Sequence, residues 1–343
     1  MSYQQKPTLI IFVTSVFDTP KTGPATFARL LHKFYKQDGV NFKIITSDCE
    51  NPDQHIITVK KTYIKSFVYY RLWKKAKNVI KNFPENRIII HYNNAFPYLY
   101  FGKLGNTTIT QVNDYYATSP NLHRIKQLNR KNHIRYYLQY FFESRSLNKS
   151  DIIIFNSIFT RDFLLKAYDI NSTKCKVIYK SIDPSKLSKN IKNTCSGTIL
   201  FIGNNFYLKG LDILIEASAF MPSVKTIYIA GPPKLDHYIM KKINSLSSKI
   251  EFKLIGSLKQ SDLYELMRKS DILVIPARAE SLGVSVIEAL AQGIPVITSG
   301  EGGLQEVLNG YPTICADNQN LIPEYLGKSV KKMIEALYNT YEL

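Results

Sequence analysis

The stretch Pro276–Thr298, PARAESLGVSVIEALAQGIPVIT, carries the strongest fold signal of the chain. It begins at the end of an apolar run, Asp271–Pro276, and places two glutamates, Glu280 and Glu288, around a turn of small residues. A helix that starts after a strand presents unpaired backbone N–H groups and the positive end of its dipole, and both attract anions. If the stretch were helical throughout, the two glutamates would lie about 12 Å apart. A phosphate with hydroxyl-bearing groups on either side, as in a sugar nucleotide, would fit that layout.

Apolar runs recur along the whole chain and alternate with segments of helical periodicity. The runs are nearly continuous, which is typical of parallel strands covered on both faces. This alternation predicts the α/β class, with two sets of strands and helices forming two Rossmann-like parallel-sheet domains. We expect strands at Thr8–Val13, Phe42–Thr46, Arg87–His91, Thr108–Val112, Ile152–Asn156, Lys176–Tyr179, Thr198–Ile202, Thr226–Ala230, Ile250–Leu254, Asp271–Pro276 and Pro295–Thr298. We expect helices at Pro24–Lys36, Ile158–Tyr168, Leu211–Phe220, Ser261–Lys269 and Val284–Ala291.

The polar segment Ser181–Ser196 lacks periodicity and predicts a linker between the domains. We therefore expect an N-terminal domain at residues 1–183, a C-terminal domain at 184–322 and a C-terminal helix at 323–343. Ligands of open α/β sheets bind beyond the carboxyl ends of the strands. The predicted active site is thus a cleft between the two domains.

The composition of the 343 residues, 45% hydrophobic and 21% charged, is that of a globular protein. No apolar run approaches the roughly 20 residues of a membrane-spanning helix, and we expect a cytoplasmic protein. Four scattered cysteines without a C-x-x-C pair argue against a zinc site. The formal charge of +18 favours an anionic partner: nucleic acid, an anionic membrane surface or a phosphorylated substrate.

A lysine lies in another strand-to-helix loop. Lys209 and Gly210 fall between the strand and the helix expected within residues 198–220. A lysine in that position can neutralise a diphosphate as it departs with a nucleotide. The alternative is a surface lysine beside a helix-capping glycine. Similarly, Glu288 could be a solvent-facing carboxylate on an amphipathic helix, and Glu280 a loop charge.

These motifs resemble the retaining GT-B glycosyltransferases of family 4. The family hallmark is a strand, then Pro-Ser-x-x-Glu-x-Phe-Gly, Glu-Ala-x-x-x-Gly-x-Pro-Val-x-x-Ser and a Gly-Gly-x-x-Glu turn. The resemblance implies a GT-B fold, in which two Rossmann-like domains face each other across a cleft, and a nucleotide-diphosphate sugar as donor. The matching segments here are Pro276–Gly283, Glu288–Thr298, Gly302–Glu306, Lys209–Ala217, Ile229–Gly231, Ile255–Ser257, Ser270–Asp271, Ser150–Ser157 and Val177–Asp183.

The resemblance also implies roles for single residues. Glu280 would contact hydroxyls of the transferred sugar, and Glu288 would accept hydrogen bonds from the ribose. Lys209 and backbone N–H groups around Leu282–Val284 would hold the diphosphate, and Gly256–Leu258 would line the base. The predicted catalytic residues are Glu280, Lys209 and His91. The predicted donor-binding residues are Gly23, Asn204, Gly256, Ser257, Leu258, Ser281, Leu282, Gly283, Val284 and Glu288.

Two asparagines depart from the family pattern. Asn204 stands where the family has an arginine that neutralises the diphosphate, so Arg278 or Lys180 would have to supply that charge. Asn113 replaces a histidine in a loop near the sugar and the acceptor, so a catalytic imidazole is absent there.

The N-terminal domain contributes two of the predicted site residues. Gly23, in the loop Asp18–Thr26, occupies the place of the family's Gly-Gly loop, where backbone meets sugar and diphosphate. His91 matches a family histidine, with Asn93 where a second histidine is common. The alternatives are a plain strand–helix turn and a structural histidine.

No D-x-D motif occurs in the sequence, and no His, Asp and Glu residues have the spacing of metal ligands. We therefore expect no metal cofactor, with side chains and the helix dipole stabilising the diphosphate and activity persisting in EDTA.

The segment Lys60–Lys81 contains no acidic residue and combines a basic face with Tyr69, Tyr70 and Trp73. Basic amphipathic helices with aromatic residues at the boundary suit anionic lipid surfaces. The alternative is an ordinary helix packed on the sheet with solvated lysines. A second basic stretch, His123–Arg135, could lie on the same rim.

The predicted function is a cytoplasmic, membrane-associated glycosyltransferase that transfers a sugar to a glycan or lipid-linked acceptor with retention of configuration. Assembly of bacterial surface polysaccharide, such as lipopolysaccharide O-antigen or capsule, is the expected role. Alternatives are a non-catalytic GT-B subunit that activates a partner enzyme and a nucleotide-sugar epimerase. A nucleic-acid partner is not expected, because only the net charge suggests it and no recognition motif is present.

Overall fold

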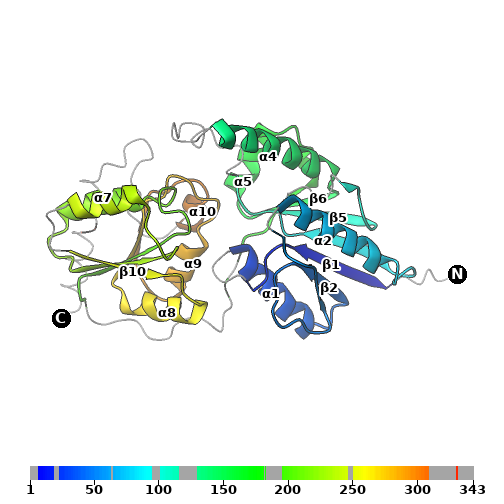
Figure 1. Cartoon of the computed structure of the whole chain (residues 1–343), viewed down its shortest axis with the longest axis horizontal. Helices are drawn as coiled ribbons and strands as arrows, with labels where there is room; N and C mark the ends of the chain where they lie inside the picture. The colour runs from blue at the N-terminus through cyan, green and yellow to red at the C-terminus, as the bar shows by residue number, and fades with distance from the viewer. Residues whose placement is uncertain are drawn as a thin grey trace. The chain divides into compact units, whose positions relative to one another are not determined.

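The structure is a computed structural model that describes residues 7–18, 23–62, 65–94, 101–115, 130–180, 182, 195–245, 250–308 and 330, with backbone alone at 65, 66 and 130–139. The chain forms two compact units, Met1–Lys180 and Ser181–Leu343 (Figure 1). Most of the expected linker, residues 123–129 of the basic stretch His123–Arg135, and all of the expected C-terminal helix except Val330 lie outside the described residues. Val330 is helical and packs in the core of the second unit.

The first unit is built on a seven-stranded sheet in the order β3-β2-β1-β4-β5-β6-β7. All of its strand pairs are parallel. The order of the strands reverses between β1 and β4, and the loops after these two strands flank the switch point where such sheets bind ligands. The elements are β1 Thr8–Thr14, α1 Gly23–Gln37, β2 Phe42–Thr46, β3 Ile56–Thr58, α2 Lys65–Ile80, β4 Arg87–Tyr92, β5 Thr107–Val112, α4 Arg130–Lys149, β6 Ile152–Phe155, α5 Ile158–Ala167, η2 Ser172–Lys174 and β7 Cys175–Val177.

The second unit is built on a five-stranded parallel sheet in the order β10-β9-β8-β11-β12. Here the order reverses between β8 and β11, so the loops after those strands flank the second switch point. The elements are β8 Thr198–Ile202, α6 Leu211–Ala217, η4 Ser218–Phe220, β9 Thr226–Ala230, α7 His237–Ser245, β10 Glu251–Gly256, α8 Gln260–Lys269, β11 Ile272–Ile275, α9 Val284–Ala291, β12 Val296–Thr298 and α10 Leu304–Leu308.

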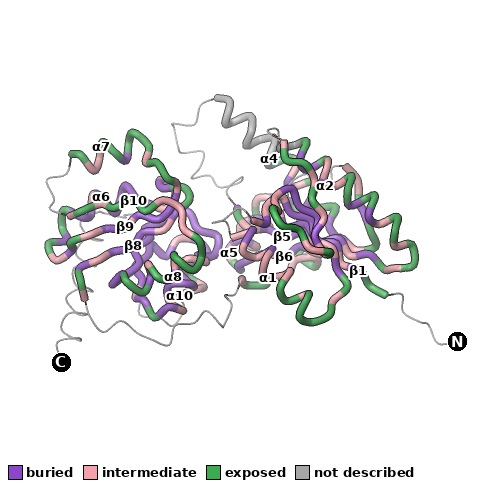
Figure 2. The backbone as a smooth tube through the Cα atoms, turned by 60° about the horizontal axis from the view of Figure 1, so that its bottom comes forward, coloured by how far each residue is buried: buried purple, intermediate pink, exposed green. Residues whose placement is uncertain are grey.

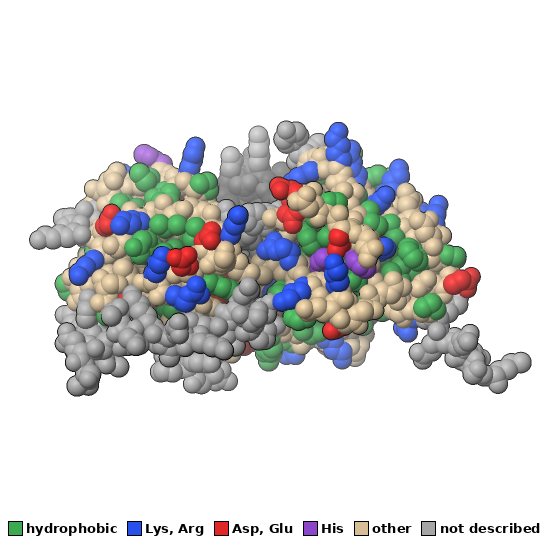
Figure 3. Space-filling model, turned by 90° about the horizontal axis from the view of Figure 1, so that it is seen from below, with side chains coloured by type: hydrophobic (Ala, Val, Ile, Leu, Met, Phe, Trp, Pro, Cys, Tyr) green, Lys and Arg blue, Asp and Glu red, His purple; other side chains and the backbone are tan. Residues whose placement is uncertain are grey.

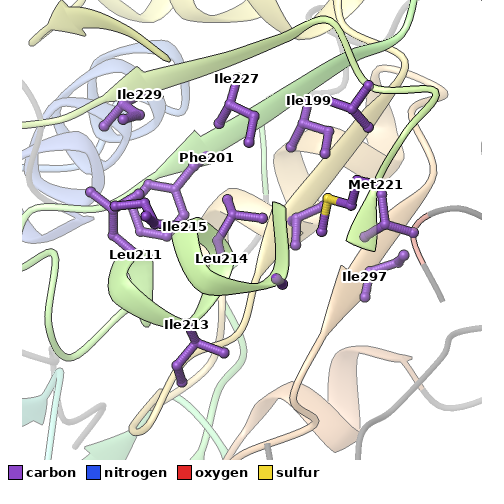
Figure 4. Close-up of a cluster of buried hydrophobic side chains, with 14 of the residues drawn as sticks. Ile199, Phe201, Leu211, Ile213, Leu214, Ile215, Met221, Ile227, Ile229 and Ile297 are labelled. Carbon is purple, nitrogen blue, oxygen red and sulfur yellow. The ribbon is translucent and has the colours of Figure 1, made fainter. Parts of the chain in front are cut away.

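Each sheet is covered on both faces, as the continuous apolar runs predict. In the second unit, Leu211 and Leu214 of α6 pack against Phe201 on one face (Figure 4). On the other face, Val286 of α9 packs in one cluster with Leu273 of β11. Burying one such side chain contributes about 1.5–3 kcal/mol. Figure 2 shows the result, with buried strands inside and exposed residues along the outer sides of helices such as α7.

The first unit follows the same plan, and the side chains of β1 alternate between its two faces. Leu9 joins a cluster with Leu72 and Ala76 of α2. Phe12 joins the opposite cluster with Ala28 of α1.

The predicted strands are all present, with ends shifted by at most two residues, and among the strands of the described residues the prediction omits only the short edge strand β3. Among the described helices, none has the length and apolar character needed to cross a bilayer. On the face shown in Figure 3, Lys and Arg side chains are scattered over both units.

Candidate functional site

The glutamate stretch forms a loop and the start of a helix at the carboxyl edge of the second sheet. The loop at residues 276–283 connects β11 to α9, which begins at Val284. Gly283 caps the helix in the left-handed region, with φ 89° and ψ 50°. A Cβ atom there would lie 2.4 Å from Leu304 Cδ2, so Leu304 would have to move, and the positive φ also favours glycine. Because Glu280 lies in the loop before α9, the stretch is not helical throughout, and the condition for the 12 Å separation is not met.

Lys209 and Glu280 meet at the switch point between β8 and β11. Lys209 Nζ forms an ion pair with Glu280 Oε2, and the two side chains are 18% and 9% exposed, respectively. Glu280 Oε1 also accepts a hydrogen bond from Ser281 N at 3.1 Å. The backbone of Glu280 is held as well, since Gly303 N donates to its carbonyl oxygen at 3.0 Å. Neither residue is a solvated surface charge.

Glu288 is buried in the second turn of α9 and faces α8. Its Oε1 accepts hydrogen bonds from Gln260 Nε2 at 3.0 Å and from Tyr264 Oη at 3.2 Å. Burial raises the pKa of Glu288, and the two hydrogen bonds partly oppose that rise. The sequence interpretation did not include Gln260 and Tyr264. Their i, i+4 spacing on one helix face is the signal that would have indicated them.

The loop at Gly256–Leu258, expected to line the base, lies at the same edge of the sheet. Gly256 has φ 74°, a conformation that favours glycine. Ser257 Oγ donates to the carbonyl oxygen of Gly231 at 2.6 Å, and Gly231 N donates to the carbonyl oxygen of Gly256 at 3.0 Å. A Cβ atom at Gly231 would lie 2.1 Å from the carbonyl oxygen of Gly203. These contacts hold the ends of β8, β9 and β10 close together.

Arg278 and Lys180, the two possible replacements for the arginine that the family has at position 204, have different surroundings. Asn204 is exposed in the loop after β8. Arg278 uses its guanidinium to bind the Asp212 carboxylate and the carbonyl oxygen of Tyr207. Lys180 belongs to the first unit, where its Nζ lies 6.0 Å from the centre of the Phe27 ring.

Gly23 and His91 lie at the carboxyl edge of the first sheet. Gly23 begins α1, and a Cβ atom on it would lie 3.7 Å from Lys180 Nζ. The His91 ring packs edge-on against Phe12, with centroids 4.9 Å apart. Burial lowers the pKa of His91 to about 4, so the imidazole is neutral at physiological pH. Within the part of the chain that the structure describes, His91 Nε2 has no hydrogen-bond partner.

Three asparagines form a chain of amides beside His91. Asn93 Nδ2 donates to Thr14 Oγ1 and to the carbonyl oxygen of Pro24, both at 3.0 Å. Asn113 Nδ2 donates to the carbonyl oxygen of Asn93. Asn156 Nδ2 donates to that of Asn113 at 3.0 Å. The chain thus connects the tips of β6, β5 and β4 to both ends of the loop before α1, and two of its members stand where the family pattern has histidines.

The predicted site residues therefore form two groups, one in each unit. The second unit brings a lysine, two carboxylates and a helix N-terminus to one edge of its sheet. Across the described ranges, no group of three or more His, Cys, Asp and Glu side chains has the geometry to hold a metal ion. The second unit holds Asn204, Lys209, Gly256, Ser257, Leu258, Glu280, Ser281, Leu282, Gly283, Val284 and Glu288, and the first holds Gly23 and His91.

Comparison with known proteins identifies the family. Residues 184–343 match the family model described as glycosyl transferases group 1, and residues 22–186 match the one described as glycosyltransferase family 4. The chain is a group 1 glycosyltransferase. This glycosyltransferase is 28% identical over 314 residues to the uncharacterized glycosyltransferase MJ1178 of Methanocaldococcus jannaschii, covering 89% of this chain and 82% of the relative. Further curated relatives match over 153–177 residues, and the chain spans 34–42% of their length.

Solved structures confirm the fold class of the glycosyltransferase. WaaG, a glycosyltransferase involved in lipopolysaccharide biosynthesis, superposes with a TM-score of 0.74 at 18% identity, covering 97% of this chain and 92% of WaaG. Alr3699/HepE of Anabaena, in complex with UDP-glucose, superposes with a TM-score of 0.70 at 18% identity, covering 97% of this chain and 91% of that one. The two parallel-sheet α/β domains are therefore those of a GT-B glycosyltransferase.

Proposed function

We propose that this glycosyltransferase moves a sugar from a nucleotide-diphosphate sugar to an acceptor hydroxyl with retention of the anomeric configuration. The observation that carries the proposal is the largely buried ion pair between Lys209, in the loop before α6, and Glu280, in the loop directly before the N-terminus of α9. A UDP-sugar is the first donor to test, because Alr3699/HepE was solved with UDP-glucose.

Each group at the carboxyl edge of the second sheet has its own role in the proposed reaction. The diphosphate lies at the first amides of α9, which have no acceptor within the helix, and Lys209 neutralises it. Glu280 binds hydroxyls of the sugar. Glu288, held by α8 beside the base loop, binds the ribose through hydrogen bonds.

The reaction proceeds on one face of the sugar. The bond from the anomeric carbon to the diphosphate oxygen breaks, and the acceptor oxygen bonds to the same carbon from the same side. The acceptor proton passes to the departing diphosphate. Lys209 and the helix amides stabilise the charge that develops on the diphosphate, a contribution often worth about 3–4 kcal/mol per donor removed. No divalent ion takes part in this scheme, because a cation and a helix N-terminus already neutralise the diphosphate.

The acceptor side of the proposal is a glycan or a lipid-linked glycan precursor at an anionic membrane surface. Phe67 and Tyr70 of α2 are 58% and 40% exposed, and the same helix carries exposed lysines at Lys74 and Lys75. The inner face of α2 packs on the sheet through Leu72, so the helix serves the fold and also presents a basic aromatic surface. The similarity in fold to WaaG, which is involved in lipopolysaccharide biosynthesis, supports a role in bacterial surface polysaccharide assembly.

Donor turnover with site variants tests the function. We expect Glu280→Gln and Lys209→Met each to lower kcat/KM for the donor about 100-fold, since each removes a group that acts on the donor in the transition state. Glu265→Gln is the matched control, because Glu265 is an exposed carboxylate that pairs only with Lys269 among the described residues. The assay is run with nucleotide sugars in EDTA, and the anomeric configuration of the product is read by NMR.

Each contrary result rejects a defined part of the proposal. Donor binding without turnover would indicate the non-catalytic subunit. Conversion of the donor without transfer would indicate the epimerase. A strict requirement for Mg²⁺ or Mn²⁺ would reject the metal-free scheme.

A further inference from the structure

An arginine binds the loop that carries Lys209 to other parts of the second unit, in addition to the core packing of Phe206. Arg278 Nη1 and Nη2 donate to the two oxygens of Asp212, each at 2.7 Å. Nη1 also donates to the carbonyl oxygen of Tyr207 at 2.7 Å. The guanidinium carbon lies 4.1 Å from the centre of the Tyr207 ring, close enough for a cation–π contact. One side chain therefore contacts the loop residue Tyr207 and the first turn of α6.

The backbone of Arg278 binds the same loop. Its N–H donates to the carbonyl oxygen of Leu208 at 2.8 Å, one residue before Lys209. One residue after Lys209, a Cβ atom at Gly210 would lie 2.0 Å from the carbonyl oxygen of Pro276. Lys209 is thus placed between two points at which its loop touches the segment that leads to Glu280.

The loop is itself a folded turn, whose internal hydrogen bonds couple the position of Tyr207 to that of Lys209. Lys209 N donates to the carbonyl oxygen of Asn205 at 3.0 Å, and Gly210 N donates to that of Tyr207 at 3.1 Å. Leu208 N donates to Asn205 Oδ1 at 3.0 Å. A displacement of Tyr207 would therefore move Lys209 with it.

The chemistry of the pair favours arginine specifically. The side chains of Asp212 and Arg278 are 5% and 29% exposed, so the carboxylate is buried and needs its partner. Two parallel bonds to one carboxylate, with a flat face left to stack on an aromatic ring, require the planar guanidinium. A lysine in its place would keep the charge but lose the two parallel bonds and the stacking.

We propose that Arg278 is a positioning residue that fixes the 204–210 loop so that Lys209 is held against Glu280 for the donor diphosphate. Arg278 acts through Lys209 and does not itself bind the donor. This inference rests on the proposed role of Lys209 in sugar transfer. Because the guanidinium of Arg278 is bound to Asp212, its positive charge does not replace that of the arginine that the family has at the position of Asn204.

The first test is Arg278→Lys in the full-length protein, assayed with the donor that the wild type uses. We expect kcat to fall about 10- to 100-fold, because small misplacements of a catalytic group have effects of that size. The donor KM should change less than kcat, since Lys209 acts mainly on the departing diphosphate. The control is Arg268→Lys, an exposed arginine of α8 that donates to Gln292 Oε1 at 2.9 Å. Its kcat should stay within about twofold of wild type.

The decisive test repeats Arg278→Lys in a Lys209→Met background. If Arg278 acts through Lys209, its substitution should cost about twofold or less in that background, since coupled residues are not additive. An equal loss in both backgrounds would overturn the proposal, as would wild-type kcat for Arg278→Lys. If a single substitution prevents folding, the double variant Arg278→Met with Asp212→Asn is used instead. It removes both charges and therefore leaves no unpaired buried ion. It should show the same loss of kcat and the same dependence on Lys209.

A measurement that does not require enzyme turnover tests this inference independently of the proposed function. Hydrogen exchange of the peptide that spans residues 204–211 should be about tenfold or more faster in Arg278→Lys than in wild type, because the loop loses its anchor. If wild type transfers no sugar, the proposed function fails while exchange still tests the anchor. Unchanged protection of that peptide in Arg278→Lys would reject the anchor whatever the activity.

Discussion

Glu143 of α4 buries its carboxyl group in the first unit, where its Oε2 accepts a hydrogen bond from Tyr168 Oη at 3.1 Å. Burial, together with the negative charge of Asp114, raises the pKa of Glu143 to about 8. A free glutamic acid titrates near 4.3. The folded protein therefore binds a proton at neutral pH that the unfolded chain has released, and the stability of the first unit depends on it.

We predict that Glu143→Gln makes the protein more stable at high pH. Between about pH 4.5 and pH 8 the native state binds more protons at this site than the unfolded state, so stability falls as pH rises through that window. Glutamine keeps an acceptor for Tyr168 without an ionisable group. Its melting temperature should exceed that of wild type by roughly 2–4 °C or more at pH 8, with little difference at pH 5. Melting curves at several pH values measure this, and a constant difference over the range would contradict the prediction.

At the level of single residues, local motifs predict the site well and distant partners poorly. Glu280 and Glu288 can be recognised because they stand in one continuous pattern with small residues between them. Arg278 also stands there, but its partner Asp212 is 66 residues away, and only the fold brings them together. The family pattern indicates a lost histidine at Asn93, whereas the Asn93 amide binds the Thr14 hydroxyl and the Pro24 carbonyl oxygen on either side of the loop before α1.

At the level of elements, the central strands are predictable because each is a long apolar run buried on both faces. β3 has only three residues at the edge of its sheet, which is too short to show periodicity. β10 is also an edge strand, and exposed Leu254 and Ile255 make its end indistinct in sequence. The start of α9 depends on the conformation of Gly283, which composition alone does not reveal.

We predict that α2 binds anionic membranes through its exposed face. Wild type should bind vesicles containing phosphatidylglycerol at low salt and dissociate as salt screens the lysines. Replacing Phe67 and Tyr70 together by alanine should weaken binding about tenfold or more, because two exposed aromatic rings no longer enter the interface. Phe220→Ala, an exposed aromatic residue of the second unit, is the control. Absence of wild-type binding at low salt, measured by co-sedimentation, would reject the membrane proposal.

At the level of the whole molecule, each unit has its own sheet and cores on both of its faces. All contacts described for Lys209, Glu280 and Glu288 lie within the second unit. The side-chain contacts of the proposed diphosphate site therefore belong to one separately folded part. The predicted cleft between the domains stays a prediction.

We predict that residues 181–343, expressed alone, fold and bind UDP but transfer no sugar. The fragment retains its own apolar cores and the proposed diphosphate site, so its affinity for UDP should stay within about tenfold of the full chain. Titration calorimetry measures the affinity, with Lys209→Met in the same fragment as the control. A folded fragment that does not bind UDP, while the full chain does, would show that the first unit is needed for nucleotide binding.

The asparagine chain of the first unit has a consequence for how this half responds to acidity. Amides neither gain nor lose protons under physiological conditions. The junction that joins β4, β5 and β6 to Pro24 at the start of α1 therefore keeps its strength when Glu143, in the same unit, changes charge. A rise in pH that charges Glu143 can loosen the packing of α4 and still leave the alignment of Gly23 undisturbed.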